Sequence, residues 1–291
     1  TLAILMVLAG FGYKISAVPF HFWTPDVYEG APLSITAYLS VAPKAAAFAL
    51  MIRFFNQTFA DGGAMKGLDS VSLTQLPWPE ILSILSVATM TLGNVVALQQ
   101  KSIKRMLAYS SIAHAGYMLL AMPVMSGDSI YAIMMYLVMY LFMNLGAFFV
   151  VIIVKNKTGG ESFDDYKGLG WEMPFVGAAM TLFMVSLTGL PPTAGFIGKF
   201  YIFASLIKGG STYYWLVVIG GINSVVSLYY YLKVVKVMYF EGERTDKILF
   251  PSNVLTGTLI FTAVPSLFLG IYWNPIASWI QNSLVFFIQN L

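Results

Sequence analysis

The chain has 291 residues, of which 58% are hydrophobic and only 10% are charged, and its mean hydropathy is +0.76. Soluble proteins carry about 25% charged residues, so this composition excludes a soluble globular enzyme, a nucleic-acid-binding protein and a disordered scaffold. The formal net charge of +3 is too small a surplus to indicate an acidic partner. Because the sequence has no cysteine and only two histidines, it favours neither an iron–sulfur cluster nor a structural zinc site in this chain.

Apolar segments long enough to cross a bilayer follow one another along the chain. We predict an all-α polytopic membrane protein with spans near residues 1–22, 33–55, 80–99, 104–124, 129–154, 174–207, 213–239 and 253–273. The uncharged tail, 275–291, mixes polar residues with apolar residues at helical spacing, which is typical of an interfacial helix. The first residue is Thr and lies in an apolar stretch without the basic flank of a signal peptide, so we expect a longer polypeptide.

The connecting segments predict the orientation of the chain in the membrane. Ten basic residues follow the third, fifth and seventh spans, and three lie on the opposite side. Since Lys and Arg collect on the cytoplasmic side, we place the first group in the cytoplasm. The first group comprises Lys101, Lys104, Arg105, Lys155, Lys157, Lys167, Lys233, Lys236, Arg244 and Lys247, and the second comprises Arg53, Lys66 and Lys208.

Two of the spans contain residues that interrupt a helix. Segment 174–207 is longer than one crossing needs, and near its middle it reads TGLPPTAGFIGK, where two prolines remove backbone donors and glycines permit non-helical angles. In the first span, Pro19 follows Lys14 by five residues. We therefore expect discontinuous helices, which in transporters mark the ion path.

Four ionisable residues remain inside the predicted spans: Lys14, Lys44, His114 and Lys199. A charge at the bilayer centre costs roughly 2.5–3.5 kcal/mol on insertion scales, so such groups are a functional-site hypothesis by default. The alternative is structural: Lys44 could be satisfied by backbone carbonyls, Lys14 and Lys199 could snorkel, and His114 could be a packing residue. As a relay, an imidazole can pass a proton between its two nitrogens.

The acidic residues lie in the connections or at the ends of the spans, and none falls in the middle of one. The intramembrane lysines therefore have no carboxylate partner at the same depth in this sequence. We expect that partner in another part of the polypeptide or in a neighbouring subunit.

Three stretches resemble a known family. They are Gly12–Pro32 (GYKISAVPFHFWTPDVYEGAP), Lys104–His114 (KRMLAYSSIAH) and Gly189–Lys199 (GLPPTAGFIGK). All three are similar to the antiporter-like membrane subunits of respiratory complex I, the proton-pumping NADH:quinone oxidoreductase, and to its subunit N in particular. The first stretch resembles the seventh helix of that subunit and the loop that follows it.

The resemblance implies a fold of fourteen helices, with two inverted five-helix repeats whose discontinuous helices are the seventh and the twelfth. Residues 1–55 then hold the last two helices of the first repeat, 80–239 hold the second repeat with its broken helix at 174–207, and 253–273 form the final transmembrane helix. The family's relay lysines fall on Lys14, Lys44 and Lys199, and its relay position on the tenth helix falls on His114. The family's glutamate on helix five has no counterpart here.

The resemblance also implies the function. The chain is expected to move protons through these four residues, as a subunit of an enzyme whose flavin (FMN), iron–sulfur clusters and quinone belong to partner subunits. We expect no cofactor, metal or redox chemistry in this chain itself. Its partners are expected to be the lipid bilayer and other membrane subunits, including further antiporter-like ones, in a bacterial inner membrane rather than that of an organelle.

Three alternatives stay open on the sequence. A cation/proton antiporter subunit of the Mrp type shares the superfamily and the buried lysines, and a photosynthetic NDH-type complex has a similar subunit that takes electrons from ferredoxin. A purely structural membrane scaffold would use the lysines for assembly. The stretch Thr24–Pro32 favours complex I over the Mrp type.

Overall fold

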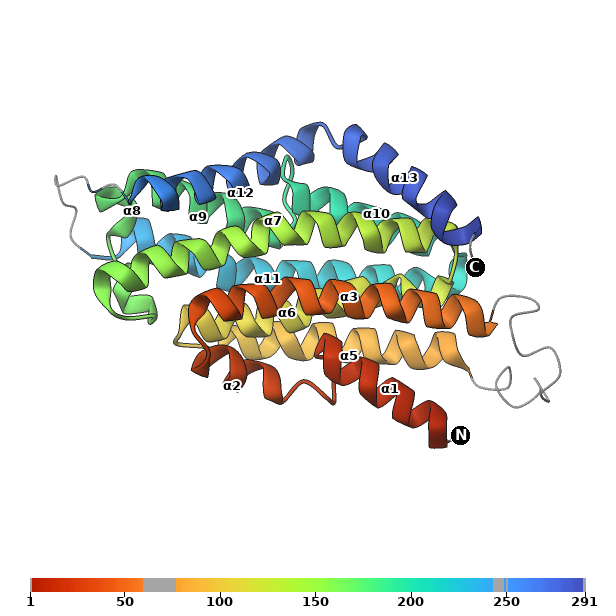
Figure 1. The fold of residues 1–291 in the computed structure, drawn as a ribbon. Helices are drawn as coiled ribbons and strands as arrows, with labels where there is room; N and C mark the ends of the chain where they lie inside the picture. The colour runs from red at the N-terminus through yellow and green to blue at the C-terminus, as the bar shows by residue number, and fades with distance from the viewer. Residues whose placement is uncertain (1, 60–76, 243–248, 250, 290–291) are drawn as a thin grey trace.

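The computed structural model describes residues 2–59, 77–242, 249 and 251–289, and every regular element in this part of the chain is a helix. The long helices lie side by side along one axis (Figure 1). In chain order the elements are α1 (Leu2–Ile15), α2 (Trp23–Gly30), α3 (Leu33–Phe59), α5 (Trp78–Leu98), α6 (Ile103–Leu120), η1 (Met122–Val124), α7 (Gly127–Thr158), η2 (Phe163–Tyr166), α8 (Leu169–Glu172), α9 (Pro174–Thr188), α10 (Ala194–Lys208), η3 (Ser211–Tyr213), α11 (Tyr214–Phe240), α12 (Asn253–Ile271) and α13 (Asn274–Gln289).

In the described part of the chain, six helical segments are long and apolar enough to cross a membrane: Leu33–Phe55, Trp78–Leu98, Ile103–Val124, Gly127–Thr158, Ser211–Phe240 and Asn253–Ile271. The predicted span 174–207 is interrupted, because residues 189–193 separate α9 from α10. The predicted first span, 1–22, holds α1 and a break at 16–22, and α2 follows beyond it. The predicted all-α polytopic fold with discontinuous helices is therefore confirmed.

One local expectation was wrong. We treated Thr24–Pro32 as a loop, but most of it belongs to helix α2. Pro25 lies in the first turn of α2, where a helix has no use for the missing N–H. Tyr28, one turn later, is fully buried and anchors the helix. A proline near a helix start therefore misled a pattern-based assignment.

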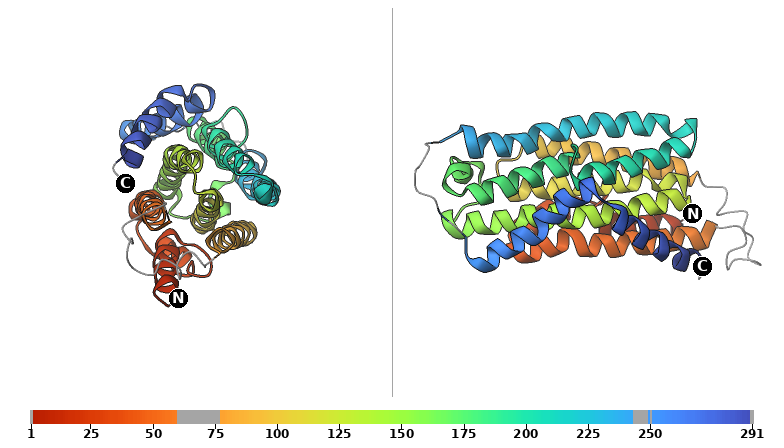
Figure 2. Two further views of the ribbon diagram at one scale, coloured as in Figure 1. Left: turned by 90° about the vertical axis from the view of Figure 1, so that its right-hand side faces the viewer. Right: turned by 90° about the horizontal axis from the view of Figure 1, so that it is seen from above.

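Helix α7 forms the centre of the bundle. It packs against α3, α9, α10 and α12, and the end-on view in Figure 2 shows it enclosed by the other helices. Its 32 residues begin after a capping box in which the side chains of Ser126 and Ser129 each accept a backbone N–H of the other. Gly159, with a φ of +81°, ends the helix in the left-handed conformation.

Helices α5, α7 and α11 all end at the same end of the bundle (Figure 1). A single bridge pairs Ser102 with Ser162, and the N–H of Leu249 donates to the carbonyl of Glu172 at 2.8 Å. Of the basic residues assigned to this side, Lys104 and Arg105 lie in the first turn of α6, and the other described ones lie on α7, α11 or the connections there. The remaining basic residues of the loops, Arg244 and Lys247 on this side and Lys66 on the opposite side, lie outside the described residues.

Helix α13 follows α12 after a two-residue break and runs on toward the opposite end of the bundle (Figure 1). It packs against α7, with Ile280 fully buried and Leu284 nearly so. Its helical character agrees with the spacing of apolar residues in 275–291. The interfacial position of this tail stays a prediction.

Two glycines allow α5 and α6 to lie in close contact. A Cβ at Gly116 would come within 2.5 Å of the Met90 backbone nitrogen, and a Cβ at Gly93 within 2.6 Å of the Ala113 nitrogen. Because these neighbours are backbone atoms, no rotation of a side chain could relieve such an overlap. The contact fixes α6 against α5, and α6 carries several residues of the site described below.

We predict that Gly116→Ala destabilises the protein. The added methyl group has to push α5 and α6 apart, and overpacking of this kind costs about 1–3 kcal/mol. Gly221→Ala is the matched control, because Gly221 is also helical and a Cβ added there would meet no atom within 4 Å. The thermal unfolding midpoint of the full-length protein in detergent should fall for Gly116→Ala and stay level or rise for Gly221→Ala. Equal midpoints would contradict the packing argument.

Candidate functional site

Lys44 lies inside the bundle on α3, and only 1% of it is exposed. Its ammonium donates to the backbone carbonyl of Ser111 at 2.6 Å and to the Ser111 hydroxyl at 2.9 Å, both on α6. Pro43, the preceding residue, has no N–H to give to the helix, so the backbone hydrogen bonding of α3 is already interrupted here. The structure thus places this cation between two helices, held by uncharged oxygen atoms.

Lys199 lies on α10, just after the interruption of the broken helix, and it is 4% exposed. Its ammonium donates to the carbonyl of Thr188 at 2.7 Å and to the Ser224 hydroxyl at 2.9 Å. It also lies 4.3 Å from the centre of the Tyr117 ring, a cation–π contact. Thr188 is the last residue of α9, so its carbonyl has no partner within the helix and carries part of the negative end of the helix dipole.

His114 lies on α6 and is 1% exposed. Both ring nitrogens have hydroxyl partners: Nδ1 lies 2.7 Å from the Tyr136 hydroxyl on α7, and Nε2 lies 3.0 Å from the Tyr231 hydroxyl on α11. Tyr231 in turn shares a hydrogen bond with the hydroxyl of Ser110. The imidazole is therefore held from two sides by groups that can both give and accept a proton.

Helix α6 connects these three groups. Ser111, His114 and Tyr117 are spaced three residues apart, so they share one face of the helix. Ser111 holds the ammonium of Lys44, and the ammonium of Lys199 lies over the ring of Tyr117. The face thus brings two cations and an imidazole, from three different helices, into one buried row.

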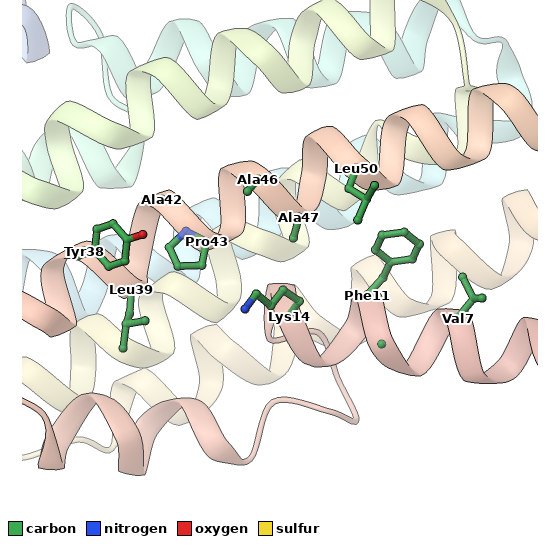
Figure 3. Close-up of a pocket in the computed structure, with 11 residues that line it drawn as sticks. Val7, Phe11, Lys14, Tyr38, Leu39, Ala42, Pro43, Ala46, Ala47 and Leu50 are labelled. Atoms are coloured by element: carbon green, nitrogen blue, oxygen red, sulfur yellow. The ribbon is translucent and has the colours of Figure 1, made fainter. Parts of the chain in front are cut away.

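Lys14 is placed differently from the other predicted site residues. It lies in the last turn of α1 and is exposed, in a groove of about 840 Å³ between α1 and α3. Figure 3 shows its side chain extending from the end of α1 toward the stretch of α3 that holds Leu39 and Pro43. The structure therefore joins Lys44, His114 and Lys199 through α6 and leaves Lys14 outside that row, in the groove between α1 and α3.

Sequence reasoning missed one buried cation. Lys104 was set aside as a charge between two spans, yet it is 1% exposed, and its ammonium donates to the carbonyls of Glu29 and Ala31 at 2.9 and 2.8 Å. It holds the carboxyl end of α2 and lies 3.5 Å from Glu161. Its burial follows from the packing of α2 against α6, which no local pattern in the sequence indicates.

The tyrosine and serine partners were also missed, because a hydroxyl gives no distinctive pattern in a sequence rich in tyrosine. Among the described residues, every ion pair lies toward an end of the bundle and none involves Lys44, His114 or Lys199. Nor does that part of the chain hold a group of three His, Cys, Asp or Glu side chains suited to a metal ion. The row is chemically suited to carry protons between neutral hydroxyls, amines and an imidazole.

Comparison with known proteins points in the same direction. The family described as "NADH:quinone oxidoreductase/Mrp antiporter, TM" matches residues 1–227. The chain is 52% identical to NADH-quinone oxidoreductase subunit N 2 of Sorangium cellulosum over 284 residues, which cover 96% of the chain and 54% of the relative. The chain thus spans about half the length of the curated relatives it matches.

Solved structures share the fold. A chain of respiratory complex I from Thermus thermophilus superposes with a TM-score of 0.76 at 32% identity, over 95% of this chain and 58% of that one. A chain of the Mrp complex from Dietzia sp. DQ12-45-1b superposes with a TM-score of 0.81 at 18% identity, over 97% and 58%. The second likeness concerns the fold alone.

We predict that Gly189→Ala disturbs the Lys199 site. Gly189 has a φ of +86°, and a Cβ there would lie 2.8 Å from Cδ of Lys199, so the substitution strains the backbone and displaces the lysine from Thr188. Gly159→Ala is the matched control, since its φ is +81° and no atom lies within 4 Å of the added group. Both variants place an alanine in the left-handed backbone conformation, which destabilises the protein by about 1–2 kcal/mol. Only Gly189→Ala should lose about a further 1–3 kcal/mol of folding stability through overpacking. This loss is measured as a lower midpoint of thermal unfolding. Equal losses would show that Gly189 does not support Lys199.

Proposed function

We propose a function from one premise: the chain belongs to the NADH:quinone oxidoreductase and Mrp antiporter transmembrane family. It is an integral membrane protein that crosses the bilayer several times, and its curated relatives are bacterial proteins. We infer that it acts in the bacterial inner membrane as the proton-translocating subunit N of a complex I type NADH:quinone oxidoreductase.

The observation that carries this proposal is the buried row of Lys44, His114 and Lys199 along one face of α6. Two ammonium groups removed from water and from carboxylates are costly to keep charged, so a proton bound there is poised to leave when a nearby charge changes. An imidazole between them can accept a proton on one nitrogen and release one from the other. The row is thus a path by which protons cross the interior of the bundle.

Lys14 lies outside this row, in the groove between α1 and α3. We propose that it forms the junction to a further part of the pathway, where a carboxylate from another segment or subunit faces it. Movement of that carboxylate would raise or lower the cost of a proton on Lys14 through its charge alone. The groove would then be covered in the assembled protein.

The proposed domain organisation follows the same family fold. Residues 1–55 form the last two helices of a first five-helix repeat, and 80–239 form a second repeat with its discontinuous helix at 174–207. Residues 253–273 form a final transmembrane helix, and 275–291 an interfacial tail. The described helix bounds fit this division, since α1 with α2 and α9 with α10 are the two interrupted helices.

The energy would come from partner subunits. We propose that electrons pass from NADH through FMN and iron–sulfur clusters to quinone in other chains, and that further antiporter-like subunits lie beside this one. The sequence has no cysteine with which to hold such a cluster itself. Quinone reduction elsewhere would then drive proton movement in this chain through charge changes passed between subunits.

A second candidate function is that of a cation/proton antiporter subunit of the Mrp type, because the description of the matched family includes the Mrp antiporter. A subunit of a photosynthetic NDH-type complex is a variant of the first proposal, in which ferredoxin replaces NADH as the electron donor. To separate them, the native protein is purified in mild detergent, its partners are identified by mass spectrometry, and NADH-driven quinone reduction is assayed. Flavin and iron–sulfur subunits with that activity support complex I, whereas antiporter-like chains alone without electron transfer support the Mrp type.

We predict that Lys199→Ala abolishes proton transport in an assembled complex. Loss of a proton-transferring group typically costs 10²- to 10⁴-fold in the step it serves, so NADH-driven proton uptake by reconstituted vesicles should fall to about the background. Lys208→Ala is the control, because Lys208 also lies on α10 but is exposed and paired with Asp128 at 3.0 Å. Its variant should pump as the native complex does.

Assembly is checked in parallel by native gel electrophoresis. If Lys199→Ala assembles and pumps normally, the relay proposal fails. If it loses assembly in step with activity, and Lys44→Ala does the same, the lysines serve the structure of a membrane scaffold instead.

A further inference from the structure

The carboxyl end of α2 is held by side chains from two other helices. The hydroxyl of Thr36 on α3 donates to the carbonyl of Tyr28 at 3.0 Å. The ammonium of Lys104 on α6 donates to the carbonyls of Glu29 and Ala31 at 2.9 and 2.8 Å. Thr36 and Lys104 both lie in the first turns of their helices. The end of α2 is therefore tied to the beginnings of α3 and α6 at the same time.

The local sequence leaves these carbonyls without helical partners. Pro32 stands four residues after Tyr28, at the position whose N–H would close the helical hydrogen bond, and proline has no N–H. Helix α2 ends at Gly30, and in the described part of the chain no backbone N–H donates to the carbonyls of Glu29 or Ala31. The side chains from α3 and α6 thus satisfy a helix end that the backbone cannot satisfy itself.

The two holding side chains are buried, so water cannot take their place. Thr36 is fully buried and Lys104 nearly so. At the surface, Arg105 pairs with Asp26 and Glu29 and joins the same two helices, α2 and α6. Exposed ion pairs contribute only about 0–1 kcal/mol, whereas a buried carbonyl that loses its donor is costly. Lys104 is therefore the stronger hold between α2 and α6.

The helices held in this way carry Lys44 and its acceptor. Thr36 precedes Lys44 on α3 by eight residues, and Lys104 precedes Ser111 on α6 by seven, which is about two helical turns in each case. Helices α3 and α6 both begin at this end of the bundle and run in the same direction (Figure 1). The end of α2 thus lies between the two helices, two turns before the point where Lys44 meets Ser111.

We propose that Lys104 is a positioning residue for Lys44: together with Thr36 it clamps the end of α2 between α3 and α6, and so sets the spacing at which Lys44 meets Ser111. This inference rests on the proposed proton-relay function and adds to it a buried cation that carries no proton of the relay. Both hydrogen bonds of Lys44 are to Ser111, at 2.6 and 2.9 Å, so they depend on the distance between α3 and α6. A shift of about 1 Å is enough to break bonds of this length.

The test is Lys104→Met in the assembled, full-length complex. Methionine keeps an unbranched side chain but has no donor for the two carbonyls. NADH-driven proton uptake by reconstituted vesicles should fall about 10- to 100-fold, since a small misplacement of a transferring group has effects of this size. Lys104→Arg keeps the positive charge and the N–H donors, so it should restore uptake to within about threefold of the native value.

Lys155→Met is the matched control. Lys155 pairs with Glu161, as Lys104 does, but it lies on α7 and its side chain is 44% exposed. The variant removes the same charge beside the same carboxylate and leaves the end of α2 in place. Its uptake should equal that of the native complex.

A second variant, Thr36→Val, separates positioning from the charge of Lys104. Valine has nearly the shape of threonine, so the substitution removes one hydrogen bond to the end of α2 without changing any charge, and uptake should fall about two- to tenfold. Thr262→Val is its control, because Thr262 is also buried but its hydroxyl donates to carbonyls of its own helix, α12. The double variant of Thr36 and Lys104 should lose less than the product of the two single losses, because both act on one helix end.

Three results would overturn the inference: native uptake in an assembled Lys104→Met complex, no recovery in Lys104→Arg, or losses in Thr36→Val and Lys104→Met that multiply independently. If Lys104→Met does not assemble on native gels, Thr36→Val decides, and native uptake in that variant overturns the inference. Failure of the broader proposal is distinguishable. If Lys199→Ala also pumps normally, the relay itself is absent, whereas if Lys199→Ala stops transport and Lys104→Met does not, only the clamp is refuted.

Discussion

The burial of lysine ammonium groups inside an apolar bundle is the constraint on which the rest of the structure depends. Such a group needs oxygen acceptors, and inside a continuous helix most carbonyls already accept hydrogen bonds from the same helix. Lys44 shares one of these carbonyls, that of Ser111, with helix α6. The ends of helices offer carbonyls that have no partner within the helix. Lys199 is held by the last carbonyl of α9, and Lys104 by two carbonyls at the end of α2. The break between α9 and α10 therefore supplies a helix end inside the bundle, where a continuous helix would have none.

The same constraint explains why α6 is the most enclosed helix of the site. It offers the Ser111 oxygens to Lys44, the imidazole of His114 to two tyrosines, and the Tyr117 ring to Lys199. Close contact with α5 through Gly93 and Gly116 holds it in register. A proton path across a membrane protein needs groups at fixed spacing, and one rigid helix face provides that spacing.

Much of this could be predicted from the sequence, for physical reasons. Long apolar runs identified the spans, and the TGLPPTAG stretch identified the break between α9 and α10, since proline and glycine act locally. Helix α2 was missed because a proline in a first turn resembles a loop signal. The buried position of Lys104 and the tyrosine partners of His114 depend on which helices pack together, and no local pattern encodes that. Whether Lys14, Lys44, His114 and Lys199 carry protons stays a proposal.

The central claim is a continuous proton path through the middle of the bundle. The hydrogen bonds of Lys44 end on Ser111, and those of His114 on Tyr136 and Tyr231, so water must bridge the steps between neighbouring groups. The most direct measurement is electron cryomicroscopy of the native complex at a resolution that shows ordered water. The account predicts water molecules that link Ser111 to His114 and Tyr231 to the Lys199 ammonium. Tightly packed apolar side chains in those two intervals, without water, would contradict it.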